Sequence, residues 1–527
     1  MTSGSASNAR QSRRGFLKGS VVLGGGLAAG ALAPAAASAQ EAEEAGRTLE
    51  ADVLVVGSGL AGLTAAARAA EQGANVLLIE KLAKGYWAPG GDMPLSGQML
   101  IFAGSTYSAL DAGVEQLEKQ LTEGTGGMAP PELIKAAAET AGTAYQWIKD
   151  QGCEFEERAL GAATVPVFAP SKIGGGYWGS DKPGGETDAS EHGGKVAALK
   201  LEANILESGG QILYETKAES LITDDSGAVV GVRARDAEGP FTIKAKATIL
   251  CTGAWSLDRA MIAQYVTQSA ESFYNATYGT PGSTGDGHKM AIAIGAAPRS
   301  LNYTYSIFMP AVVGRVPNHD LRMYSMPFNA GVVVGASGER LYDEALGRHV
   351  GGHTILRKEM NNLGYFIIDS KMYEGVAAQV EKMVELGGEV YSGETFEELA
   401  EAAGISPYLA TTMEEYNAAA EAGTTSKLRI PRGGEPAPIN EPPFYAVPFV
   451  VGTCDENNAA IMVNPKAEVL DVDGNVIPGL YAAGHTMHGA YAAGLVNEHG
   501  GHVGGLANAL VFGYISANSA VEYVSAE

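Results

Sequence analysis

Cysteine is scarce in this sequence, and its scarcity narrows the possible redox chemistry. Cys153, Cys251 and Cys454 are the only three among 527 residues, and none belongs to a CxxC or CxxCH motif. An iron–sulfur cluster held by four neighbouring cysteines and a covalently attached haem are therefore excluded, and a disulfide framework is not indicated. If electrons pass through this protein, its cofactor must receive them from elsewhere.

Basic residues are also in short supply. The chain carries 36 Lys and Arg against 60 Asp and Glu, which gives a formal net charge of −24 at pH 7. A chain this acidic does not favour binding to nucleic acid or to an anionic membrane surface. Solubility outside the cell accounts for the charge, and a redox partner with a basic face is the open alternative.

The N-terminal region lacks a long apolar run and reads instead as an export signal. Residues 12–18, SRRGFLK, match a twin-arginine signal, and Ala37-Ser38-Ala39 is a small-residue cleavage site. The apolar stretch 21–33 is too short and too rich in Gly and Ala to favour the alternative, a membrane anchor. We therefore expect cleavage after Ala39, export of the folded protein to the periplasm or another extracytoplasmic space, and no stable membrane insertion. Because the removed segment holds four basic residues and no acidic one, the mature charge would be −28.

A dinucleotide-binding fingerprint follows this leader in its required context. Apolar residues 52–56 and 75–79 predict two strands, and the Ala-rich residues 63–72 predict a helix between them. The first strand leads into GSGLAG at residues 57–62, whose glycines permit a tight turn, close approach of a pyrophosphate and close helix–strand packing. Glu80 ends the second strand and can accept a hydrogen bond from a ribose hydroxyl. The alternative is a glycine-rich turn in an ordinary α/β protein.

The remaining pattern predicts an α/β protein with an additional lobe. Helices are expected at residues 131–152, 194–209 and 504–520 and in a segment ending at 294, strands at 211–213 and 241–250, and a hairpin over 220–232. Composition shifts toward aromatic residues from residue 302, which marks a lobe that runs to about Pro443. No second GxGxxG follows a strand, which counts against a separate nicotinamide site.

Several blocks, taken in order, resemble the flavoprotein family of soluble fumarate reductases, urocanate reductases and 3-ketosteroid dehydrogenases. They are GSGLAG at 57–62, the pair Glu80-Lys81, CTGA at 251–254, TGDGHKMAIAIGA at 284–296, GERLYDE at 338–344, KAEVL at 466–470 and VIPGLYAAG at 476–484. The resemblance implies a Rossmann-like FAD-binding domain interrupted by an α+β capping domain. The expected division is a signal peptide at 1–39, FAD-binding parts at 40–300 and 444–527, and the capping domain at 301–443.

FAD is the cofactor that the fingerprint and the resemblance together imply. The residues expected to bind it are Gly57, Gly59, Leu60, Ala61, Gly62, Glu80, Lys81, Gly91, Asp92, Ser96, Gly97, Ala218, Thr252, Gly253, Asp286, Gly484, His485, Leu506 and Ala507. Four histidines late in the chain, at positions 485, 488, 499 and 502, lie in flexible glycine-rich sequence without a paired carboxylate, so we expect no metal site there.

The resemblance also implies catalytic residues. In the fumarate reductase branch the proton donor is an Arg four residues after the Glu of a GxRFxNE-type block, and here Arg348 follows Glu344 by four residues. Arg348 is thus the expected proton donor and Glu344 its relay, which must restore a proton to a group whose pKa is ordinarily above about 12. The alternative is a surface ladder of ion pairs between Arg340, Glu344 and Arg348.

Two departures from the fumarate reductase pattern bear on the substrate. The block that carries a carboxylate-binding Arg in those enzymes reads NEHGGH here, at residues 497–502, and Glu456 stands where they have a His. Fumarate itself is therefore not expected. In the ketosteroid dehydrogenase branch a Tyr occupies the position of His499, which would donate a hydrogen bond to a substrate carbonyl; a packed or solvent-facing His is the alternative.

These observations predict an exported FAD-dependent reductase. It would add a hydride and a proton across a C=C bond conjugated to a carboxylate or ketone, with electrons from an external cytochrome or flavoprotein. Its first rival is a 3-ketosteroid-type dehydrogenase, which the C-terminal sequence favours and Arg348 disfavours. Its second rival is a non-catalytic flavin electron carrier.

Overall fold

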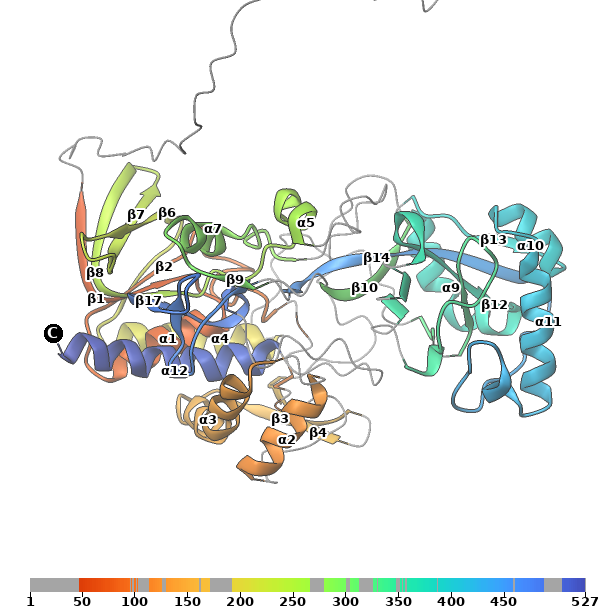
Figure 1. Ribbon diagram of the computed structural model, residues 1–527, viewed down its shortest axis with the longest axis horizontal. Helices are drawn as coiled ribbons and strands as arrows, with labels where there is room; N and C mark the ends of the chain where they lie inside the picture. Colours follow the sequence, from red (N-terminus) through yellow and green to blue (C-terminus); the bar gives the residue numbers. More distant parts are fainter. Residues whose placement is uncertain are drawn as a thin grey trace, which may run out of the picture. The chain divides into compact units, whose positions relative to one another are not determined.

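The computed structural model places most of the chain after the leader. It describes residues 47–94, 96, 99–100, 102, 113–125, 129–160, 163–170, 192–265, 279–299, 304–311, 326–328, 330–346, 351–352, 354–355, 358–385, 387–457, 460–487 and 505–526. The first of its two larger sheets has a parallel centre and the second is antiparallel, and Figure 1 labels most of their strands.

The first sheet has eight strands with a parallel centre. Its order is β16 (Glu468–Leu470), β17 (Val476–Ala482), β8 (Gly239–Leu250), β1 (Thr48–Val56), β2 (Val76–Ile79) and β5 (Gln211–Leu213). β17, β8, β1, β2 and β5 run parallel. β6 (Lys217–Thr223) and β7 (Val229–Asp236) form an antiparallel hairpin, and β7 pairs antiparallel with β8. Val53 to Val56 and all of β2 are buried, as expected for strands covered on both faces.

The helices beside this sheet pack closely on one another. α1 (Leu60–Glu71) packs on α12 (Gly505–Ala526) and on α4 (Gly193–Glu207). A Cβ added to Gly513 of α12 would lie 2.6 Å from the Ala61 carbonyl oxygen, so the two helices meet more closely than larger side chains permit. α3 (Pro131–Asp150) packs on α12 and on α2 (Val114–Gly124). None of the helices in the described ranges is both long and apolar enough to span a bilayer.

The elements predicted around the fingerprint are confirmed. β1, α1 and β2 form the expected strand–helix–strand unit, and α3, α4, α12, β5, β8 and the β6–β7 hairpin lie where the patterns placed them, with ends shifted by a few residues. The helix expected to end at residue 294 is α7 (Asp286–Ala293). The α/β fold class follows from these elements.

The second sheet has five antiparallel strands. Its order is β10 (Thr304–Pro310), β14 (Phe444–Asn457), β12 (Leu363–Ile368) and β11 (Val332–Val334), and β13 (Tyr391–Gly393) also pairs with β14. Alternate residues of β12 serve opposite faces. Phe366 and Ile368 pack toward α9 (Ser370–Glu385), and Tyr365 and Ile367 toward α10 (Phe396–Ala403) and α11 (Tyr408–Glu421).

The second sheet continues past the boundary expected at residue 443. β14 begins directly after that point, and all its strand pairings are in this sheet. The expected boundary, Pro443, directly precedes β14, and a strand can begin immediately after a proline. The return to the first sheet follows β14, and the division into domains is otherwise a prediction.

Shorter elements complete the described chain. They are β3 (Phe155–Leu160), β4 (Ala163–Phe168), α5 (Arg259–Tyr265), β9 (Pro298–Arg299), β15 (Ala460–Ile461) and the 3₁₀ turns η4 (Glu344–Leu346), η5 (Met360–Asn362), η6 (Thr425–Lys427) and η7 (Gly484–Thr486).

Candidate functional site

A cavity lies at the carboxyl edge of the first sheet. Because β1, β2, β8 and β17 are parallel, the residues that follow them converge at one edge, which is where open α/β sheets bind ligands. Gly57, Glu80, Cys251 and Ala483 each come directly after one of these strands, and all four line the cavity. Its empty volume is about 930 Å³, part of it open to solvent.

The three glycines of the GSGLAG turn have different steric roles. Gly57 has a φ of +106°, and a Cβ there would lie 2.3 Å from the Cys251 carbonyl oxygen. A Cβ on Gly62 would lie 1.9 Å from the Gly57 carbonyl oxygen. A Cβ on Gly59 would meet no heavy atom within 4 Å, and Gly59 lines the cavity. Two glycines therefore allow close packing of the protein itself, and the third leaves room for a ligand.

The start of α1 offers donors to this space. No side chain caps the helix N-terminus at Gly59, and Gly59, Leu60 and Ala61 line the cavity. The first N–H groups of a helix have no partner within the helix and lie at the positive end of its dipole. This arrangement suits a phosphate group.

Glu80 is held in one orientation at the end of β2. Its Oε2 accepts hydrogen bonds from the Ser58 backbone N at 2.9 Å and from Ser58 Oγ at 2.8 Å. Its Oε1 accepts from the Leu82 backbone N at 2.8 Å. A carboxylate has about four acceptor positions, so Glu80 retains capacity for a ribose hydroxyl while it also braces the glycine turn.

Lys81 connects β2 to the start of α7. Its Nζ donates to Thr284 Oγ1 at 2.6 Å and to Asp286 Oδ2 at 2.7 Å. Burial of Asp286 opposes its ionisation, but the hydrogen bond and the charge of Lys81 outweigh burial, so the pKa of Asp286 is lowered. Lys217 Nζ lies 3.8 Å from the other carboxylate oxygen of Asp286. Lys81, Lys217 and Asp286 all line the cavity, so charged groups define this part of its wall.

Most of the residues predicted to bind the cofactor meet at this cavity. Those that line it are Gly57, Gly59, Leu60, Ala61, Glu80, Lys81, Gly91, Asp92, Ala218, Thr252, Gly253, Asp286, Gly484, His485 and Leu506. They come from eight separate stretches of sequence, which only the fold brings together.

Four of the predicted residues are not seen in the wall. Gly62 is packed behind the turn, and Ala507 is fully buried in the first turn of α12. Ser96 lies just beyond the wall residue Met93, whose carbonyl oxygen accepts from its hydroxyl at 3.0 Å. Gly97 lies outside the described residues.

The sequence analysis missed other residues of the wall. Trp87, Met93, Thr280 and Ser283 line the cavity but lie in loops without a periodic pattern. Thr280 and Ser283 share a hydrogen bond between their hydroxyls at 3.0 Å, and Ser283 directly precedes the TGDG block. Their position next to that block was the one available signal.

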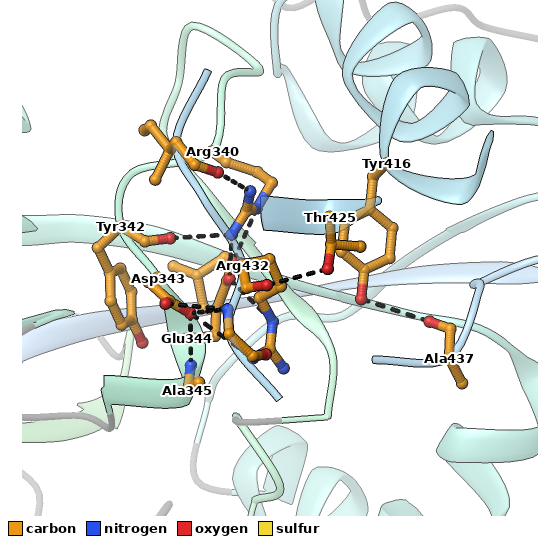
Figure 2. A network of polar contacts seen from close by, with 12 residues as sticks. Arg340, Tyr342, Asp343, Glu344, Ala345, Tyr416, Thr425, Arg432 and Ala437 are labelled. Carbon is orange, nitrogen blue, oxygen red and sulfur yellow. Dashed lines mark hydrogen bonds and ion pairs between the residues drawn. The ribbon is translucent and has the colours of Figure 1, made fainter. Parts of the chain in front are cut away.

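Glu344 lies in a separate, buried network of charges (Figure 2). Arg340 donates to it twice, from Nη2 to Oε2 at 2.5 Å and from Nε to Oε1 at 3.3 Å. The Val333 backbone N donates to Oε1 at 3.0 Å, and Arg432 Nε lies 3.4 Å from Oε2. Glu344 is 0% exposed, Arg340 6% and Arg432 3%.

This network corrects the idea of a surface ladder. Arg340 and Glu344 do form an ion pair at i, i+4 spacing, but inside the protein. Arg432 is the partner that sequence spacing could not reveal. The Glu344 carboxylate accepts three hydrogen bonds and pairs with the charge of Arg432, so a relay role would require this network to rearrange. The two other predicted catalytic residues, Arg348 and His499, lie outside the described residues, and their roles are predictions.

Metal-binding geometry is not found in the described part of the chain. There, no three His, Cys, Asp or Glu side chains gather in a way that could hold an ion. His485 lines the cavity, with its Nδ1 3.6 Å from Asp92 Oδ2. The other three late histidines lie outside the described residues.

Comparisons with known proteins agree with the geometry of the cavity. A family model described as FAD binding domain matches residues 52–502. A urocanate reductase of Eggerthella lenta is 28% identical over 456 residues, which cover 83% of this chain and 70% of that protein. A fumarate reductase (cytochrome) of Shewanella frigidimarina is 25% identical over 486 residues, which cover 90% and 77%. The fold is similar to that of 3-ketosteroid delta1-dehydrogenase from Sterolibacterium denitrificans, whose structure is in complex with 1,4-androstadiene-3,17-dione. The TM-score is 0.72, and the two sequences are 22% identical over 91% of this chain and all of that one.

Proposed function

The chain belongs to the FAD-binding domain family, and from this premise we propose that it is an exported reductase of activated C=C bonds. The cofactor is FAD, and the enzyme class is an FAD-dependent oxidoreductase that acts on CH–CH bonds. The observation that supports the proposal most directly is the cavity at the carboxyl edge. It combines an uncapped helix N-terminus, an open space at Gly59 and a braced Glu80 carboxylate.

The reaction proposed is the two-electron reduction of an enoate or enone. The GSGLAG turn and Glu80 would hold FAD, which when reduced would supply the hydride for one carbon of the C=C bond, while a proton would go to the other carbon. The residues of this chain that we propose to manage that proton are Arg348, as donor, and Glu344, which is anchored by Arg340 and Arg432. An external cytochrome or flavoprotein then returns two electrons, because cysteine spacing rules out a local cluster or attached haem in this chain.

The substrate we propose is larger than fumarate and carries a ketone or a single conjugated carboxylate. Support comes from the sequence at 497–502, which lacks the Arg that binds a carboxylate in fumarate reductases. His499, in the same stretch, would donate a hydrogen bond to the carbonyl group of such a substrate. The same sequence feature keeps a 3-ketosteroid-type dehydrogenase as the second candidate, in which the saturated substrate reduces FAD.

Anaerobic reoxidation tests the proposal and separates these candidates. The mature protein would be reduced, mixed with fumarate, urocanate, aryl enoates or ketosteroids, and followed by flavin absorbance. Rapid reoxidation by one class of acceptor, lost in Arg348→Ala and retained in Arg429→Ala, would support the reductase. Arg429 is a suitable control because it is an exposed Arg whose partner, Glu339, lies on the surface. Reduction of the oxidised enzyme by a saturated ketosteroid, without any reoxidation by enoates or enones, would favour the dehydrogenase. Absence of both reactions would leave the flavin carrier.

Export is the part of the proposal that depends on sequence alone. Residues 12–18 and the small-residue site at 37–39 support passage through the twin-arginine pathway, which carries folded proteins and therefore suits one that binds its cofactor before export. We propose a periplasmic or other extracytoplasmic location on this basis.

A further inference from the structure

Lys195 is buried at a position that is unfavourable for a lysine. It is the third residue of α4 and only 7% exposed. A cation in the first turn of a helix faces the positive end of the helix dipole. Burial also disfavours an ammonium group, unless specific partners compensate for the lost water. A local conflict of this kind indicates that the residue has a specific task.

The partners of Lys195 belong to the loop that follows β2. Its Nζ donates to the Gly85 carbonyl oxygen at 2.6 Å and to the Pro89 carbonyl oxygen at 2.7 Å. These two residues flank Trp87, which lines the cofactor cavity, as do residues 90–93. The ammonium group therefore joins two points of one loop whose side chains and backbone form a wall of the cavity.

Further contacts join this loop to the GSGLAG turn. Gly90 N donates to the Ser58 carbonyl oxygen at 2.8 Å, and a Cβ on Gly91 would lie 3.1 Å from Gly59 Cα. The start of α4 has little freedom, because a Cβ on Gly194 would lie 2.8 Å from the Met93 carbonyl oxygen. A fixed helix start thus presents a fixed donor to the loop.

We propose that Lys195 is a positioning residue of the FAD site, whose buried ammonium group holds residues 85–93 in the conformation that FAD binds. It does not line the cavity itself. The inference concerns FAD binding, so it is independent of whether the proposed reductase activity is correct.

The charge of Lys195 makes this role dependent on pH. Burial lowers the pKa of Lys195 to about 8, with Glu202 opposing the shift and Lys84 adding to it. Lys84 Nζ and Tyr214 Oη each lie 2.7 Å from Glu202 Oε1, and burial raises the pKa of Tyr214 so that it stays protonated. Protonated Lys195 favours the loop conformation that binds FAD, so the affinity should be constant near neutral pH and decrease as the pH rises through about 8.

Other groups near the loop also titrate, and variants separate their effects from that of Lys195. His192 directly precedes α4, and Asp92 lies beside His485 in the cavity wall. Lys200, an exposed residue of the same helix, provides a matched control, because Lys200→Met removes the same charge from the surface. Lys195→Arg keeps a cation above pH 8, and Lys195→Met removes both donors and charge.

Titration of the apoprotein with FAD, followed by flavin fluorescence, tests the inference. Lys195→Met should bind FAD about tenfold more weakly at pH 7, because the Gly85 and Pro89 carbonyl oxygens lose their donor, and its affinity should no longer change around pH 8. Lys195→Arg should retain affinity at pH 9, and Lys200→Met should behave as wild type. Thermal unfolding of the apoproteins shows whether a weaker affinity has a separate origin in misfolding. Unchanged affinity in Lys195→Met would overturn the inference. If that variant does not fold, a wild-type affinity that stays constant from pH 6 to 9 would overturn it equally.

Discussion

Arg432 and Glu344 meet inside the protein, with Arg432 Nε 3.4 Å from Glu344 Oε2, although one belongs to a segment without regular structure and the other to a 3₁₀ turn (Figure 2). The carboxylate also binds Arg340 and the Val333 backbone N. Two hydrogen bonds join Arg432 to Thr425. The Arg432 backbone N donates to the Thr425 carbonyl oxygen at 3.1 Å, and the Thr425 hydroxyl donates to the Arg432 carbonyl oxygen at 2.9 Å. Glu344 is therefore a point where three parts of the chain are joined.

Replacing Glu344 should destabilise the protein strongly. Glu344→Gln removes the negative charge and leaves the guanidinium groups of Arg340 and Arg432 buried without it, which typically costs about 3–5 kcal/mol. Urea unfolding with FAD at saturation measures the change. Glu339→Gln is the matched control, since its pair with Arg429 at 3.1 Å is exposed and should contribute no more than about 1 kcal/mol. Equal, small effects in both variants would contradict the view that the buried pair joins these segments.

The glycines of the fingerprint should respond differently to alanine. In Gly62→Ala, the new methyl group would collide with the Gly57 carbonyl oxygen, which is backbone and cannot turn away. We expect the free energy of unfolding to decrease by about 1–3 kcal/mol or more, and FAD binding to be lost as a consequence. Apoprotein unfolding and FAD titration, performed on the same preparations, measure both effects.

Gly59→Ala provides the contrast to that variant. Its methyl group meets no protein atom within 4 Å and its φ of −70° suits alanine, so the stability of the apoprotein should change by less than about 0.5 kcal/mol. FAD affinity should decrease by tenfold or more, because the methyl group occupies space in the cavity at the start of α1. A Gly59→Ala protein that binds FAD as tightly as wild type would place the cofactor elsewhere.

The strand–helix–strand unit and part of the cavity wall could be predicted because local sequence specifies them. β1, β2 and the GSGLAG turn combine short apolar runs with glycines whose positions have steric reasons, and Glu80 follows at the end of β2. What could not be predicted depends on contacts between distant segments. Trp87 joins the wall through a loop that Lys195 fixes from α4, and neither residue belongs to a repeating pattern.

Two further results show the same limit. The second FAD-binding part was expected to begin at residue 444, whereas β14, which begins there, is joined to the second sheet by pairing along most of its length. Arg340 and Glu344 matched a surface pattern, whereas the pair is buried and contacts Ile430 and Arg432, which are distant in sequence. Spacing along a helix or turn indicates which residues are neighbours, but it does not indicate whether water reaches them.

The export signal should depend on its two arginines. Changing both Arg13 and Arg14 to Lys retains the positive charge but removes the pair that the twin-arginine pathway requires. We expect the wild-type protein to be recovered outside the cytoplasm without residues 1–39, and the double variant to stay inside, folded and uncleaved. Cell fractionation and N-terminal sequencing measure both. Equal export of the two proteins would indicate a different route.

Stability should decrease in mild acid because of His288. This side chain is 1% exposed, and burial lowers its pKa to about 4 from an ordinary value near 6.5. The unfolded chain therefore takes up a proton between pH 6.5 and pH 4 that the folded protein does not. The stability present above pH 6.5 is lost as the pH falls through this range, by up to about 3 kcal/mol.

The variant His288→Leu isolates this effect. Leucine fills the buried position without a group that titrates, so the variant should lose less stability than wild type between pH 7 and pH 5. Urea unfolding at pH 7, 6 and 5 measures the slope for each protein. All other titrating groups, including His485 nearby, are common to both proteins, so the difference between the two slopes belongs to His288. Identical slopes would mean that His288 is protonated in the folded protein as readily as in the unfolded chain, in which case it must have a partner that stabilises its charge.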